Sequence, residues 1–230
     1  MNFIIRRQLQ QLFFILICAG SINARESTPG IPGINGKWAN QGSIRNGTGS
    51  PYFMDEYKYS NIILERGRVF TKVKARIDLA SLEVSFISVN GIEASIEAGM
   101  IKEISFSDTT AEGIVLYKFK TGFPSIDKQT RNNFYLMLAD GRCSFLKAVM
   151  KKVTEKKNDI SGEVVRDFET YEEFYIFSKG VMKKWKKDKD FILAELSDRQ
   201  PQVSQFIDAN KITFRSEEQL IRLLNYYNSL

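Results

Sequence analysis

The sequence predicts a mainly β, α+β protein in which an antiparallel β body, either a sandwich or barrel-like, is followed by about three C-terminal helices. Three observations support this fold class. Between residues 51 and 180, apolar and polar residues alternate with a period of two in short segments. Turn-forming residues separate these segments at intervals of about 10 to 12 residues, which leaves no room for helical crossovers. After residue 181, apolar residues follow helical spacing and are flanked by helix-cap signals.

The N-terminus has the layout of a secretory signal peptide. Arg6 and Arg7 precede an apolar run, and a short stretch of small and polar residues ends at Ala24. The apolar run is about half as long as the roughly 20 residues that span a membrane. We therefore expect residues 1–24 to be a cleaved signal peptide and residues 25–50, rich in Gly, Ser, Asn and Pro, to be a flexible leader. The protein is then exported to the periplasm or beyond, with no transmembrane helix after cleavage.

The β body, residues 51–180, begins with the clearest alternation. In residues 68–77, RVFTKVKARI, every second residue from Val69 to Ile77 shares one face, while lysine and arginine dominate the other. This pattern predicts a half-buried strand with a basic outer face. Four further candidate strands follow at residues 82–88, 91–99, 101–107 and 114–120.

Residues 132–153 contain the clearest hairpin signal. Asp140 and Gly141 tolerate positive φ and lie between two apolar runs. Cys143 lies on the second arm of this hairpin. We expect a small, partly buried core thiol there rather than a nucleophile, because the chain has no histidine that could activate it.

The end of the β body leads into the helical segment, residues 181–230. A last strand is predicted at residues 172–179, after an acidic turn region at residues 167–171. A first helix should follow around Phe191. Pro201 suits the first turn of a second helix, which Asn210 is expected to end in a left-handed cap.

The last helix has the strongest boundary signals. Ser216 and Gln219 have the spacing of a capping box, and an apolar stripe runs from Leu220 to Tyr227. We expect this helix to pack on the β body or on the other two helices.

Three segments make the chain resemble a group of small exported proteins of unknown function from Bacteroidota-type bacteria. These segments are GSPYFMDEY at residues 49–57, NFYLMLADGR at residues 133–142 and FIDANKITFRSEEQLIRLLNYYN at residues 206–228. The resemblance covers residues 49–230. It implies a β-rich body with a helical C-terminus and export, and it implies no catalytic residue.

A lysine-rich stretch is GVMKKWKKDKDF at residues 180–191, where five lysines surround one tryptophan. Its candidate contact residues are Lys183, Lys184, Trp185, Lys186 and Lys187. Lysines around an aromatic residue resemble a nucleic-acid-binding surface, but export makes nucleic acid a partner that we do not expect. We predict that Trp185 docks into the core while the lysines extend into water. Contact of these lysines with an acidic envelope polymer or with lipid headgroups is the alternative.

A weaker candidate site is acidic. It consists of Asp167, Glu169, Glu172 and Glu173. Two carboxylates across a cleft are what glycoside hydrolysis requires, so these residues suggest a hydrolase of envelope polysaccharide. Charge balance with lysines on adjacent strands is the competing explanation. Carboxylates that face each other in an open, aromatic-lined cleft would favour the hydrolase, and carboxylates paired with lysines would favour charge balance.

The composition excludes several chemistries. The chain has no histidine, which removes the commonest general base, the serine triads that depend on it and most catalytic zinc sites. It also has no calcium-binding loop and no phosphate-cradling glycine loop. We therefore predict no cofactor, no metal and no catalytic residue.

These observations together predict an exported, non-catalytic binding or assembly component of the bacterial cell envelope. The expected partner is an acidic envelope polymer or another envelope protein, and peripheral membrane contact is compatible with the mild positive charge, which is +6 for the whole chain and +4 once Arg6 and Arg7 are removed with the signal peptide. One alternative is the carboxylate-dependent hydrolase. Another is a protein–protein interaction module that uses an exposed strand edge or the helix pair.

Overall fold

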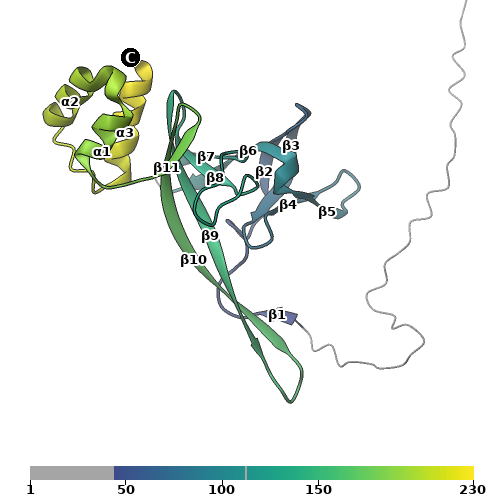
Figure 1. Cartoon of the computed structure of the whole chain (residues 1–230). Coiled ribbons are helices and arrows are strands. Elements are labelled where there is room, and N and C mark those ends of the chain that lie inside the picture. Colours follow the sequence, from purple (N-terminus) through teal and green to yellow (C-terminus); the bar gives the residue numbers. More distant parts are fainter. Residues whose placement is uncertain (1–43, 112) are drawn as a thin grey trace, which may run out of the picture. The chain divides into compact units, whose positions relative to one another are not determined.

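The computed structural model describes residues 44–111 and 113–230 (Figure 1). The expected signal peptide at residues 1–24 and most of the expected leader at residues 25–50 lie outside the described residues.

The described chain forms an 11-stranded sheet followed by three α-helices, so the predicted mainly β, α+β class is confirmed. The strands are β1 (Ile44–Asn46), β2 (Lys58–Leu64), β3 (Val69–Asp78), β4 (Glu83–Ile87), β5 (Glu93–Glu97), β6 (Ile101–Thr110), β7 (Gly113–Lys120), β8 (Tyr135–Ala139), β9 (Cys143–Lys157), β10 (Val164–Ser178) and β11 (Val181–Lys184). Their order is β1-β10-β9-β8-β7-β6-β2-β3-β4-β5, with β11 paired to β10. The sheet is open, because no pairing joins β1 to β5 among the described residues.

Strands β2 to β7 pair antiparallel, as the period-two pattern predicts, but not all in sequence order: β5 lies at the edge of the sheet, and β6 pairs with β2. The burial of β3 differs from the prediction. Val69 is 56% exposed, and only the half of β3 from Val73 to Ile77 faces the core. Lys72 has a φ of 56°, and the β2–β3 register shifts between Ser60 and Ile62. This bulge changes which side chains face inward, and alternation along one strand does not reveal it.

The predicted hairpin at Asp140–Gly141 is confirmed by β8 and β9.

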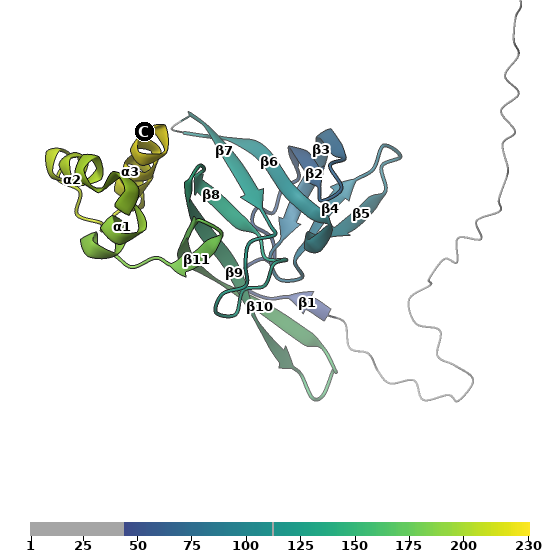
Figure 2. The same ribbon diagram turned by 45° about the horizontal axis from the view of Figure 1, so that its top comes forward.

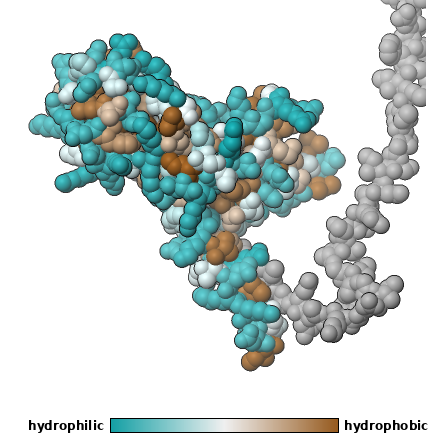
Figure 3. All heavy atoms as spheres, viewed as in Figure 1, coloured by the Kyte–Doolittle hydropathy of each residue, from teal (hydrophilic) through white to brown (hydrophobic). Residues whose placement is uncertain are grey.

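The predicted acidic turn at residues 167–171 is wrong, because these residues lie in the middle of β10. Strands β9 and β10 are 15 residues each and pair along their whole length. They extend past the other strands as a two-stranded arm (Figure 1). Ile160, in the turn at the end of the arm, is 99% exposed, and Figure 3 shows apolar surface there.

The end of the range expected to be a flexible leader belongs to the sheet. β1 pairs in parallel with Val164–Arg166 of β10. The amide of Gly47 donates to the carbonyl of Arg166, and the amide of Phe168 donates to the carbonyl of Thr48. The ordered structure therefore begins before residue 51.

The helical segment begins later than predicted. Residues 181–184 were expected to be helical, but they form β11 and pair antiparallel with Tyr175–Ser178 of β10. The helices are α1 (Lys189–Glu195), α2 (Gln200–Ala209) and α3 (Glu217–Ser229), with short 3₁₀ turns at Ala98–Met100 and Ser197–Arg199. The helices lie together beside β8 and β9 (Figure 1), and α3 contacts both strands.

The helix-end signals are confirmed in part. Pro201 occupies the first turn of α2, as predicted. The predicted left-handed cap at Asn210 is wrong: Asn210 has a φ of −96°, and Lys211 has the positive φ of 49° instead. The Ser216 hydroxyl accepts from the amide of Gln219, which is half of a capping box. The Gln219 side chain accepts from Thr213 rather than completing the box.

The core consists of three clusters of buried side chains that meet at β8 and β9. The first lies between these strands and the helices and includes Phe145, the second lies among β2 to β7 and includes Val149, and the third includes Leu146 and lies beside β11. Cys143 is fully buried in the first cluster, so the predicted core thiol is confirmed. None of the helices in the described residues is long and apolar enough to cross a membrane.

Candidate ligand pocket beside Trp185

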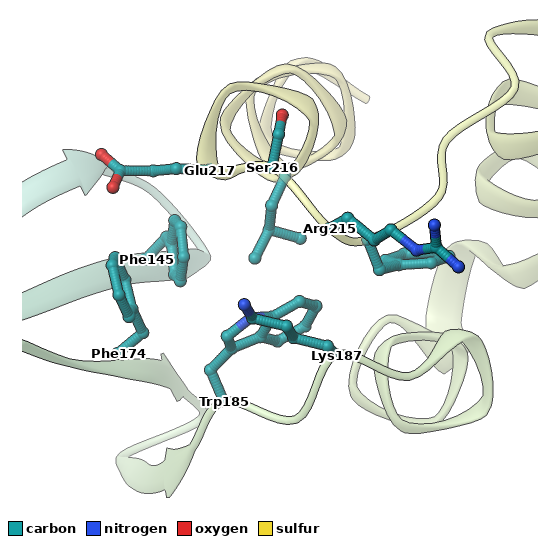
Figure 4. Close-up of a pocket in the computed structure, with 9 residues that line it drawn as sticks. Phe145, Phe174, Trp185, Lys187, Arg215, Ser216 and Glu217 are labelled. Carbon is teal, nitrogen blue, oxygen red and sulfur yellow. The ribbon is translucent and has the colours of Figure 1, made fainter.

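A cavity of about 160 Å³ lies where β9, β10, the segment after β11 and the start of α3 come together (Figure 4). It is lined by Phe145, Phe174, Trp185, Lys187, Phe214, Arg215, Ser216, Glu217 and Leu220. In Figure 4, the two phenylalanines of the strands face the cavity on one side, while Trp185 and Lys187 lie below it. Most of the lining is apolar, with a few charged groups at the margin, which is the usual composition of a ligand pocket.

Aromatic rings form the wall of this pocket. The amide of Trp185 donates to the carbonyl of Phe174 at 2.7 Å, which continues the β10–β11 pairing one step past the end of β11. The Trp185 ring packs against Phe145 and Phe191, with ring centroids 6.0 Å apart in both pairs, and against Phe214 at 6.3 Å. The prediction that Trp185 docks into the core is therefore confirmed. The ring keeps a partly exposed surface because it also lines the cavity.

Two unpaired cations stand at the margin of the pocket. Lys187 and Arg215 are both exposed, and neither forms an ion pair within residues 44–111 and 113–230. The one carboxylate of the lining, Glu217, is held by Lys147, whose Nζ lies 2.7 Å from Glu217 Oε2 and 3.4 Å from Glu172 Oε2. Lys147 thus compensates part of the charge of Glu217, and Lys187 and Arg215 are the charged groups of the lining that have no ion-pair partner in the described residues.

Lys147 remains charged despite its partial burial. Desolvation alone would lower the pKa of its ammonium group, but the hydrogen bonds and negative charges of Glu217 and Glu172 raise that pKa above the ordinary lysine value. Lys147 therefore provides a permanent partner for Glu217.

The structure separates the lysines of the predicted basic site. Lys183 pairs with Glu195 of α1, and Lys184 pairs with Glu173 of β10 at 2.7 Å. Lys186 and Lys187 are exposed without an ion pair in the described part of the chain. Of the four lysines, Lys187 alone lines the pocket.

Every carboxylate of the predicted acidic site is paired with a lysine. The pairs are Asp167–Lys156, Glu169–Lys152, Glu172–Lys147 and Glu173–Lys184. Because side chains alternate along β10, Glu172 lies on the opposite face of the strand from the other three carboxylates. The residues that are close in sequence are therefore not brought together into one site.

Glu173 also lines a second cavity, of about 200 Å³, together with Asp127. The Tyr175 hydroxyl donates to Glu173 Oε2 at 2.5 Å and lies 3.3 Å from Asp127 Oδ2. The pKa of Glu173 is lowered, first by the hydrogen bond from Lys184 and then by that from Tyr175. A glycosidase needs a carboxylic acid whose pKa is raised, so this arrangement favours charge balance over hydrolysis.

Sequence reasoning identified Trp185 and Lys187 but missed the rest of the pocket. Arg215 directly precedes the N-cap of α3, and Phe145 and Phe174 are adjacent across β9 and β10. No spacing in the sequence links these positions to residue 185.

In the parts of the chain that the structure describes, no three potential ligand side chains are grouped to hold a metal ion. Comparisons with known proteins find no family model, no curated protein and no solved structure that matches this chain.

Proposed function

We propose that the protein is an exported, non-catalytic binding component of the cell envelope that holds an acidic polysaccharide at the Trp185 pocket. The observation that carries this proposal is the combination of an aromatic wall with two unpaired cations, Lys187 and Arg215, at one cavity. The signal-peptide pattern at residues 1–24 supports the expected location.

The pocket has the chemistry that an acidic sugar requires. A sugar ring has an apolar face that can lie against the Trp185 ring, while its carboxylate would meet Lys187 and Arg215. The guanidinium of Arg215 offers a planar pair of donors that matches a carboxylate. A cavity of about 160 Å³ has room for one ring, so the polymer would bind through one unit at a time.

Binding can be followed through the fluorescence of Trp185. The chain has two tryptophans, so the Trp38→Phe variant reports Trp185 alone. We expect a polyuronate to change the emission and a neutral glucan of equal length to leave it unchanged. Raising the salt concentration should weaken binding, because added ions screen exposed charges. The double variant Lys187→Gln/Arg215→Gln should bind the polyuronate about tenfold more weakly or worse, which corresponds to about 1.4 kcal/mol.

The matched control for that double variant is Lys157→Gln/Arg131→Gln, which removes the same charges at exposed positions outside the pocket. This control should keep the affinity of the parent protein. Equal weakening in both double variants would show that net charge rather than the pocket binds the polymer. Equal binding of the neutral glucan would contradict the proposed role of the two cations.

Export is tested separately by expressing the whole chain and recovering it from the periplasmic fraction. We expect the recovered protein to begin after Ala24. Recovery of the uncleaved chain from the cytoplasm would reject the envelope location and leave the binding measurement unaffected.

A further inference from the structure

One side of β7 lacks a partner strand along most of its length. β7 pairs with β6 from Gly113 to Lys120, but it pairs with β8 at Phe119 and Lys120 only. Within the described residues, the backbone from Gly113 to Lys118 is therefore open on the side that β8 leaves free. The β6–β7 hairpin that carries this edge runs across the upper part of Figure 2.

The open edge is apolar. Ile114 is 79% exposed, Val115 37% and Leu116 67%. Exposed apolar edges pair readily with other strands, and proteins commonly block such pairing with charged side chains. This chain protects its other open edges in that way: β5 has glutamates at both ends, and the outer half of β9 contains several lysines. From Gly113 to Tyr117, β7 has no charged residue.

We propose that β7 pairs antiparallel with β7 of a second copy of the chain, so that the two sheets join into one. A two-fold axis perpendicular to the sheet keeps corresponding faces on the same side, so opposed residues must come from the same face. When the pairing is centred on Val115, Ile114 of each copy lies opposite Leu116 of the other copy. The Val115 residues of the two copies then lie opposite each other. Ile114 and Leu116 then contact each other across the joint on one face of the sheet, and the two Val115 side chains do so on the other face.

Moving the centre of the pairing by one residue, to Leu116, also keeps opposed residues on the same face, but it brings unlike side chains together. Centring the pairing on Leu116 would place the exposed Ile114 opposite Lys118, so an apolar side chain would face an ammonium group. Of these two registers, the sequence of β7 favours the one centred on Val115. The edge is six residues long, so the area that this pairing buries is much smaller than the roughly 1,600 Å² of a typical stable interface. The dimer should accordingly be weak and depend on concentration.

Sedimentation velocity of the full chain over a hundredfold range of concentration tests the dimer. We expect the sedimentation coefficient to rise with concentration toward the dimer value. The Leu116→Lys variant, which puts two charges into the apolar contact, should sediment as a monomer throughout. The matched control is Ser107→Lys, because Ser107 lies opposite Leu116 on β6, is exposed and is away from the open edge. This control should dimerise like the parent protein.

A cysteine variant tests the register. The Val115→Cys change in a Cys18→Ser background should form a disulfide between two copies under mild oxidation, since directly opposed antiparallel residues lie about 4.5–5.5 Å apart at Cα, within the disulfide range. Ile92→Cys in the same background is the control, because Ile92 is 66% exposed and lies away from β7.

Several outcomes would overturn the proposal. These are a monomeric parent protein at every concentration, a Leu116→Lys variant that dimerises normally, a Ser107→Lys variant that is equally impaired, or equal cross-linking at residues 92 and 115. Circular dichroism of each variant checks that the fold is intact, so that loss of the dimer is not mistaken for unfolding. None of these outcomes depends on the polyuronate measurement.

Discussion

At the residue scale, Asp167 joins two distant parts of the chain in the outer half of the arm. Its Oδ1 accepts from the amide and the hydroxyl of Thr48, both at 2.9 Å, and its Oδ2 lies 2.8 Å from Lys156 Nζ. The hydrogen bond from Lys156 and those from Thr48 hold the pKa of the Asp167 carboxyl far below its ordinary value. Asp167 therefore keeps β1 and the residues after it attached to β10 while it is ionised.

The Asp167→Asn change should make the folded state less stable at pH 7 and reduce its sensitivity to acid. The pKa of Asp167 is lower in the folded state than in the unfolded state, where it is about 4. The contribution of its carboxylate to the free energy of unfolding is therefore fully present above pH 4 and is lost as the pH falls through the folded-state pKa. Urea unfolding at several pH values should show the two proteins converging only below about pH 4. Glu169→Gln, which alters an exposed pair with Lys152 at 3.8 Å, is the control and should differ little from the parent. A difference that stays constant down to pH 2 would contradict this role.

Cys143 should be unreactive in the folded protein. Burial raises the pKa of its thiol to about 12, so almost no thiolate is present at pH 8. In the Cys18→Ser variant, Cys143 is the one cysteine left in the chain. A thiol-specific disulfide reagent should react with it slowly under native conditions and at once in urea. Rapid reaction of the folded protein would show that the cluster between the helices and β9 opens readily.

At the scale of elements, Asn228 fastens the end of α3 to the β8–β9 hairpin. Its side-chain oxygen accepts from the amide of Cys143 at 3.0 Å, and its nitrogen donates to the carbonyl of Cys143 at 2.9 Å. Gly141, in the hairpin turn, has a φ of 158° and leaves space for this amide, because an added Cβ would lie 2.4 Å from Asn228 Cγ. The turn and the helix end are therefore matched to each other.

The Asn228→Ala change should destabilise the protein by about 2 kcal/mol, because it leaves a buried backbone donor and acceptor of Cys143 without partners. Asn225→Ala is the matched control, since Asn225 is exposed on the same helix. Urea unfolding at neutral pH measures both changes. Alanine has a higher helix propensity than asparagine, so Asn225→Ala should keep or slightly raise the stability. An equal loss of stability in the two variants would contradict the role of the contact with the hairpin.

The elements that the sequence predicted well are those whose signal is local. The β2 to β7 strands alternate with turn residues, and the Asp140–Gly141 turn and the Ser216 cap depend on residues within a few positions. The full length of β10 was missed because its outer half is held by ion pairs with β9 rather than by an apolar face. β11 has only four residues, and lysine at two of them hides its pairing with β10.

The pocket shows again that only signals between residues close in the sequence could be predicted. Trp185 and its lysines stand out in the sequence because they are adjacent. Arg215 and Phe145 join them only through the packing of α3 on β9, and no pattern within either segment records that packing. The carboxylates show the reverse case, since residues 167–173 are close in sequence but are distributed along one strand and over both of its faces.

At the scale of the whole molecule, the three core clusters should unfold together. All three include side chains of β8 and β9, and Leu138 of β8 contacts both the helical cluster and the cluster among β2 to β7. Loss of packing in one cluster therefore exposes residues of the next. This sharing is expected to give a single cooperative transition.

The Ile104→Ala change tests that cooperativity. Ile104 is fully buried among β2 to β7, and its truncation should cost about 2–5 kcal/mol. In the Trp38→Phe background, Trp185 fluorescence reports the helical cluster, while far-ultraviolet circular dichroism reports the secondary structure of the whole fold. The midpoints of both transitions should shift to a lower urea concentration by the same amount. A fluorescence transition that stays in place would show that the helices and their part of the sheet unfold as a separate unit.

The parallel pairing of β1 with β10 has a consequence for the order of folding. The contact between Thr48 and Asp167 joins residues 119 positions apart, whereas β9 and β10 are adjacent in the chain and joined by one short turn. Closing so long a loop costs entropy that a three-residue strand cannot offset before β10 is in place. The β9–β10 hairpin should therefore form early, as a template, and β1 should attach late. Although residues 44–46 are synthesised long before β10, they should be among the last to acquire their native pairing.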